Sequence, residues 1–90
     1  MQALIENPIF NDSPFNEITK IIEDINQNLN LTELNITKRP TIIGFANQND
    51  GTLTIQVAAY TKPGAQFEAR NVLLKTYLSA IKDANIDLPK

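Results

Sequence analysis

Residues 39–89 decide the fold, and they read RPTIIGFANQNDGTLTIQVAAYTKPGAQFEARNVLLKTYLSAIKDANIDLP. Apolar and polar residues alternate over 40–48 and again over 52–61, which is the period of a β-strand. Asn49-Asp50-Gly51 separates the two runs and has the chemistry of a tight turn. The stretch therefore predicts a β-hairpin. The residues expected to share one face of its first strand are Thr41, Ile43, Phe45 and Asn47.

A long amphipathic helix is predicted at 65–83, after a Pro63-Gly64 break. Asn85 can end this helix by adopting the left-handed conformation. Residues 86–88 can then add a short last strand before Pro89. The apolar face of the helix is expected to centre on Phe67, Leu74, Tyr77, Leu78 and Ile81, with Leu73, Ala80 and Ala84 widening it and Val72 on the polar side.

The first half of the chain predicts one strand and one helix. A strand is expected at 2–7, and Pro8 disturbs it because proline cannot donate to a ladder. Asp12 and Ser13 offer cap oxygens for a helix that begins at Pro14. The next part, 26–38, is interpreted as the helix end and an irregular connection. One apolar stripe with helical spacing carries this first helix: Phe15, Ile18, Ile21, Ile22, Ile25 and Leu29.

The predicted order is β-α-β-β-α, with a possible final β, over a single domain at 1–90. Both helices are amphipathic, so both can pack on one face of an antiparallel sheet. We therefore expect an α+β fold, a ferredoxin-like β-α-β-β-α(-β) sandwich.

Composition excludes several kinds of chemistry. The chain has 90 residues, a formal net charge of −2, no cysteine and no histidine. Disulfides, Cys/His zinc sites, cysteine nucleophiles and imidazole bases are thus excluded. The lysines and arginines are spread out, so nucleic-acid binding is not expected. No apolar run approaches the ~20 residues of a membrane span. We expect no enzyme activity, no metal and no cofactor.

Several positions together resemble the C-terminal cytoplasmic domain of the small-conductance mechanosensitive channel family. They include Pro40 at a strand start, the alternating Leu53, Ile55 and Val57, and Arg70-Asn71 in the second helix. The ending Asn85-Ile86-Asp87-Leu88-Pro89 is similar to the family's Gly-Ile-Glu-Ile-Pro. The match covers 40–89, and the family's membrane helices and middle β-domain are missing from this sequence.

The resemblance implies a soluble cytoplasmic domain of a mechanosensitive ion channel, placed on the cytoplasmic side of the cell membrane as part of a larger membrane protein. In the family this domain helps build a homoheptameric cage, so the expected partner is the chain itself, and a membrane would be met only through segments absent here. The alternative is a stand-alone ferredoxin-like binding or regulatory module. The interface candidates are Ile42, Ala58 and Tyr60 on the sheet face opposite the helices, and Ile86 and Leu88 in the tail.

The sheet face opposite the helices has two interpretations. An apolar patch there usually marks an interaction site, whereas an antiparallel sheet also tolerates a face left in contact with water. The sequence favours neither.

Overall fold

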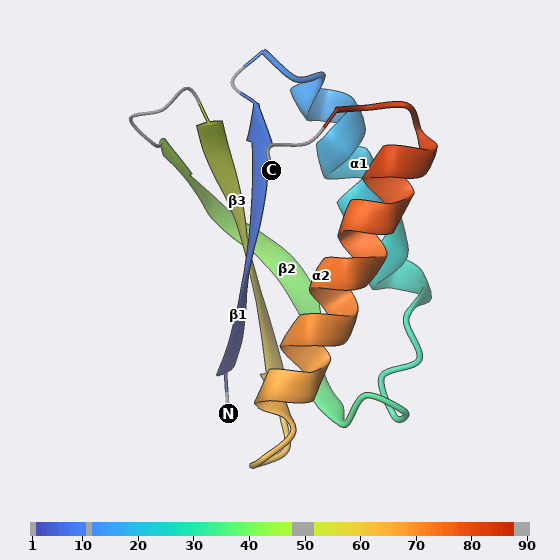
Figure 1. Cartoon of the computed structure of the whole chain (residues 1–90). Coiled ribbons are helices and arrows are strands. Elements are labelled where there is room, and N and C mark those ends of the chain that lie inside the picture. The colour runs from blue at the N-terminus through green and yellow to red at the C-terminus, as the bar shows by residue number, and fades with distance from the viewer. Residues whose placement is uncertain (1, 11, 48–51, 88–90) are drawn as a thin grey trace.

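The computed structural model describes residues 2–10, 12–47 and 52–87. Its elements follow the order β1 (Gln2–Phe10), α1 (Phe15–Asn28), β2 (Ile36–Asn47), β3 (Thr52–Thr61) and α2 (Gln66–Asp83). The strands form one antiparallel sheet in the order β1-β3-β2. Figure 1 shows both helices packed on the same face of this sheet. The small α+β class is thus confirmed, while Ile86 and Asp87 lie outside any strand.

The first strand is longer than the sequence predicts. β1 runs through Pro8 to Phe10 and pairs with β3 without a break, from Gln2 opposite Tyr60 to Phe10 opposite Thr52. Pro8 fits because β1 is the edge of the described sheet, where a missing N–H need not break the ladder. Its alternation is complete: Ala3, Ile5, Asn7 and Ile9 are buried beneath the helices.

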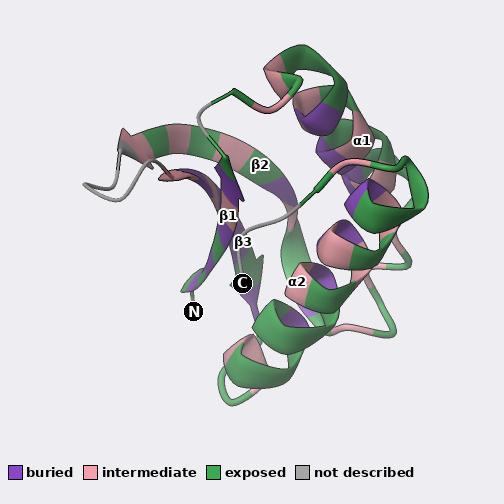
Figure 2. Ribbon diagram, turned by 45° about the horizontal axis from the view of Figure 1, so that its top comes forward, coloured by how far each residue is buried: buried purple, intermediate pink, exposed green. Residues whose placement is uncertain are grey.

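The second strand differs most from the prediction. β2 begins at Ile36, not at residue 40, and Asn35 before it takes a left-handed φ of 56°. Pro40 therefore lies inside the strand, at one of three register shifts against β3. Figure 2 shows that β2 is strongly curved, as expected for a bulged strand. The predicted turn Asn49-Asp50-Gly51 lies outside the described residues.

The register shift at Ile42–Gly44 changes which side chains share a face. Ile42 lies opposite Val57, and Gly44 lies opposite the next β3 residue, so Ile43 is an extra residue. Thr41 consequently pairs with Ala58 on the face away from the helices, whereas Phe45 pairs with Ile55 on the helix side. The prediction that Thr41, Ile43, Phe45 and Asn47 share one face is therefore wrong.

Helix α1 buries the predicted stripe. Ile18 and Ile22 are fully buried, and the other members of the stripe pack against the same core. The predicted cap is wrong, because the helix begins at Phe15 with Pro14 as its N-cap and no side-chain cap bond. The missed member of the stripe is Asn26, a polar residue that is nonetheless buried one turn beyond Ile22.

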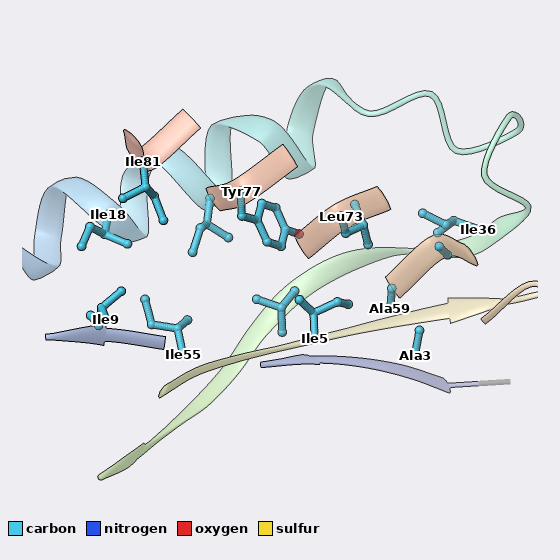
Figure 3. Close-up of a cluster of buried hydrophobic side chains, with 13 residues drawn as sticks. Ala3, Ile5, Ile9, Ile18, Ile36, Ile55, Ala59, Leu73, Tyr77 and Ile81 are labelled. Atoms are coloured by element: carbon cyan, nitrogen blue, oxygen red, sulfur yellow. The ribbon is translucent and has the colours of Figure 1, made fainter. Parts of the chain in front are cut away.

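Helix α2 matches its predicted bounds, but its buried row is rotated. Ala69, Leu73, Tyr77 and Ile81 recur at four-residue spacing and are buried. Figure 3 shows Leu73, Tyr77 and Ile81 pointing from the helix toward the strands. Phe67 was expected at the centre of the face and is instead 65% exposed. Leu74 and Leu78 were also expected at the centre and are only half-buried, whereas Leu73, expected at the margin, is fully buried.

Both ends of α2 follow the turn chemistry of the sequence. Before the helix, Ala65 N–H donates to Lys62 O at 3.1 Å and Gly64 takes a φ of +88°, which is the geometry of a type II turn with Pro63 leading. After it, Asn85 has a φ of 63°, and Ile86 N–H donates to Ile81 O at 3.3 Å. This Schellman ending confirms the predicted left-handed Asn85. Among the described residues, neither helix has the length and apolar content needed to cross a bilayer.

Candidate functional site

The sheet face away from the helices carries a mixture of apolar and polar side chains. Strand register places Leu4, Ala58 and Thr41 in one row across it, and Gln2, Tyr60 and Lys38 in the next. Leu4 is 39% exposed and Tyr60 is 41% exposed, so both offer apolar surface to a partner. We call this surface the outer sheet face. Its apolar atoms are interrupted by polar ones in every row.

The structure keeps two of the three predicted interface residues of the sheet on this face. Ala58 lies on it, although neighbours leave only 4% of the residue exposed. Tyr60 is better exposed, and the Lys38 ammonium lies 5.4 Å from the centre of its ring. Ile42 was expected beside them, but it faces the helix side opposite Val57 and packs against the core. The bulge at Ile43 is the physical reason for that correction.

The predicted tail candidates do not form one patch with the sheet candidates. Ile86 is half-buried and packs against the core where the Schellman turn reverses the chain. Leu88 lies outside the described residues. A cavity of about 490 Å³ lies beside this tail, lined by Phe10, Asp12, Ser13, Pro14, Asn85, Ile86 and Asp87. Its two aspartates do not approach a third ligand group, since the described residues hold no cluster of three metal-binding side chains.

β1 has a free edge, as the predicted order implies when no last strand forms beside it. β3 pairs with one side of β1, and no described strand pairs with the other. The sequence predicts a strand at 2–7 from a weak pattern, and the structure shows the alternation of exposed Gln2, Leu4 and Glu6. What the sequence left open was whether the tail after the second helix would form a last strand.

A groove of about 340 Å³ lies along this edge. It is lined by Leu4 and Glu6 of β1 and by Arg70, Asn71 and Leu74 of α2. Leu4 and Leu74 supply apolar surface, while the Glu6 carboxylate and the Arg70 guanidinium carry opposite charges. The pair Arg70-Asn71, which the resemblance singles out in the second helix, therefore lies beside the open strand edge.

A buried hydrogen bond joins the two helices on the side that faces the sheet; with the contact from β2 described next, we call it the buried link. The Tyr77 hydroxyl of α2 donates to Asn26 Oδ1 of α1, and Arg39 of β2 donates through Nη1 to the Asn26 carbonyl oxygen at 2.5 Å. Burial raises the pKa of the Tyr77 phenol above its ordinary value, and the hydrogen bond to Asn26 opposes this only in part. Tyr77 therefore stays neutral and serves as a structural donor.

A second groove of about 280 Å³ lies next to this link, between α1 and β2, and is lined by Glu23, Asn26, Gln27, Pro40, Thr41 and Ile42. Every polar atom named for the link already has a protein partner there. The link therefore offers the groove none of its bonded polar atoms, and we rank this groove below the strand edge.

No protein-family model matches the chain, and no curated protein is similar enough to it to count as a relative.

Proposed function

We propose that this chain is a non-catalytic assembly domain that associates with further copies of itself through its sheet. The observation that carries this proposal is the open antiparallel sheet. Both helices lie on one face, while the outer sheet face and one edge of β1 remain uncovered by the described residues. Leu4 and Tyr60 are exposed large apolar side chains in neighbouring rows of that sheet. Their apolar surface, next to an unpaired strand edge, supports a protein partner.

The proposal includes a specific sheet topology, the ferredoxin-like one. A ferredoxin-like sheet has the order 4-1-3-2, and the order β1-β3-β2 equals that sheet without its fourth strand. We propose the ferredoxin-like sandwich on this basis, in which the described residues place no strand at the fourth position beside β1. An added strand at this place would complete the sheet.

The resemblance to the mechanosensitive channel family supports one setting for this function. In that setting the domain lies on the cytoplasmic side of the cell membrane, within a larger membrane protein, and its copies form part of a cage that assembles as a heptamer. The chain would bind neither nucleic acid nor a cofactor, and it would contact the membrane only through other segments.

The second candidate is a stand-alone ferredoxin-like binding or regulatory module. The open edge of β1 favours it, because two isolated domains can complete their sheets by pairing this edge. The two settings share self-association and differ in symmetry: a ring repeats one contact around an axis, whereas a pair of copies uses a two-fold axis.

Light scattering of the purified 90-residue chain at rising concentration tests the proposal. A contact made along a single strand edge buries less than the ~1,000 Å² of a stable interface, so we expect a monomer when dilute and reversible association in the millimolar range. A mass that stays at the 10.0 kDa of one chain at every concentration would contradict self-association.

A further inference from the structure

We infer that the free edge of β1 pairs antiparallel with the same edge of a second copy, with Leu4 opposite Leu4 on a two-fold axis. The inference rests on the proposed self-association in its two-fold form, the symmetry of the stand-alone module, and it names the surface and the register. A six-stranded sheet with all four helices on one face would result.

Every second residue of β1 points its backbone N–H and C=O groups toward this free edge. Lys62 N–H, at the end of β3, donates to Asn35 O on the β2 side at 2.9 Å. The direction of the backbone N–H and C=O groups alternates along an unbroken strand. In β3 these groups therefore point to β2 from even-numbered residues and to β1 from odd-numbered residues. Even-numbered β3 residues pair with even-numbered β1 residues. The N–H and C=O groups of Gln2, Leu4 and Glu6 therefore point away from β3, toward the free edge.

Pro8 supports this alternation and limits the pairing. It is also even-numbered, so its missing N–H belongs to the free edge and costs the β1–β3 ladder nothing. A proline on an edge strand prevents further pairing at its own position. The segment able to pair is therefore Gln2 to Glu6, beside the groove that Leu4, Glu6 and Leu74 line.

Charge selects the direction of the second strand. In a parallel arrangement in register, Glu6 would lie beside Glu6 of the other copy. An antiparallel arrangement centred on Leu4 places each Glu6 opposite a neutral Gln2 instead, and Leu4 opposite Leu4. This register forms about six backbone hydrogen bonds, two for each of its three outward-facing pairs. The apolar Leu4 pair at the centre and the separation of the two Glu6 carboxylates make the segment self-complementary.

The described tail of the same chain does not compete for this segment. Asp87 lies near Phe10, because both line the same cavity at the far end of β1. Leu4 is about 20 Å from Phe10 along the strand at about 3.3 Å per residue. The described tail therefore ends far from Leu4 and leaves the Gln2–Glu6 segment open to a second copy.

Single cysteines test the register, because the chain has no other cysteine. In the inferred pair, the two Leu4 Cα atoms are about 5.5 Å apart, within the range that a disulfide bridges. Leu4→Cys should therefore form a covalent dimer on mild oxidation. Gln2→Cys is the matched control on the same strand and face. Its two copies would be about 14 Å apart, so it should crosslink at least tenfold more slowly.

A second pair of variants tests the hydrogen bonds of the edge. Leu4→Pro and Leu4→Ala both remove the leucine side chain, but only proline removes the outward N–H. Both should keep the fold, since Pro8 occupies an equivalent position in the same strand. We expect Leu4→Pro to weaken association at least tenfold more than Leu4→Ala, with unchanged circular dichroism. Stacking of two outer sheet faces would instead give equal effects, and Tyr60→Lys would then be the variant that dissociates the pair.

The outcomes separate the inference from the proposed function. A wild-type chain that stays monomeric, with no crosslinking of Leu4→Cys, overturns both. Association that continues unchanged in Leu4→Pro, with equal crosslinking of the two cysteine variants, overturns the edge pairing alone. Rapid crosslinking of Leu4→Cys together with selective loss of association in Leu4→Pro supports it.

Discussion

Tyr77→Phe removes a single oxygen atom from the buried link between the two helices. The Tyr77 side chain is fully buried and its hydroxyl donates to Asn26 Oδ1, which is itself buried. The variant loses that hydrogen bond and leaves the Asn26 oxygen without its donor. A buried acceptor left unpaired costs about 1–3 kcal/mol. That is a large part of the ~5–13 kcal/mol expected for a domain of 90 residues.

Thermal unfolding followed by circular dichroism measures this loss. A cost of about 1–3 kcal/mol lowers the Tm of a domain this size by roughly 4–24 °C. The matched control is Tyr60→Phe, which removes the same oxygen from a half-exposed tyrosine whose ring lies beside the Lys38 ammonium. Its expected effect is within about 0.5 kcal/mol. Equal effects of the two variants would refute the buried link.

The same tyrosine predicts how stability depends on pH. Burial raises the folded-state pKa of Tyr77 above the ordinary value of 10.0. The neutral phenol is therefore favoured by folding, and its contribution is complete below pH 10. It is lost as pH rises above 10, because the unfolded chain ionises first. Tyr77→Phe should reduce the fall in Tm above pH 10 relative to wild type, and an identical fall in both would contradict the assignment.

Other substitutions test the core, the turn and the buried amide. Ile22→Asp should prevent folding, because Ile22 is fully buried and an unpaired charge there exceeds the stability of the domain; a cooperative melt near the parent Tm would contradict the core. Gly64→Ala should cost about 1 kcal/mol through its positive φ alone, since no atom lies within 4 Å, whereas Gly44→Ala should be nearly neutral; the reverse order in urea unfolding would show that the turn is misassigned. Asn7→Val should stabilise by about 1 kcal/mol, because neither amide atom of Asn7 has a partner among the described residues, and a lower Tm would reveal one.

Local patterns predicted most of the elements. The α1 stripe, the bounds of α2, the left-handed Asn85 and the pairing of β2 with β3 each depend on residues close in sequence. The predicted start of β2 was four residues too late, because Pro40 suggested the beginning of a strand. The structure tolerates this proline inside the strand at a register shift.

The candidate surface was only partly predictable, for a different reason. Ile42 was assigned to the outer sheet face by strict alternation, and one extra residue at Ile43 reversed it. The burial of Asn26 could not be predicted, because a polar residue on an apolar stripe is expected to be exposed until its hydrogen-bond partner, Tyr77, is known. The free edge of β1 depended on whether the tail after α2 would form a last strand, which the sequence left open.

Amide hydrogen exchange along β1, followed by NMR at increasing concentration, tests the central claim most directly. Ala3, Ile5 and Asn7 donate toward β3 and should be protected at every concentration. Leu4 and Glu6 should exchange rapidly in dilute solution and gain at least tenfold protection as the chain associates. No concentration-dependent protection at Leu4 and Glu6, while the mass rises, would contradict assembly through the edge of β1.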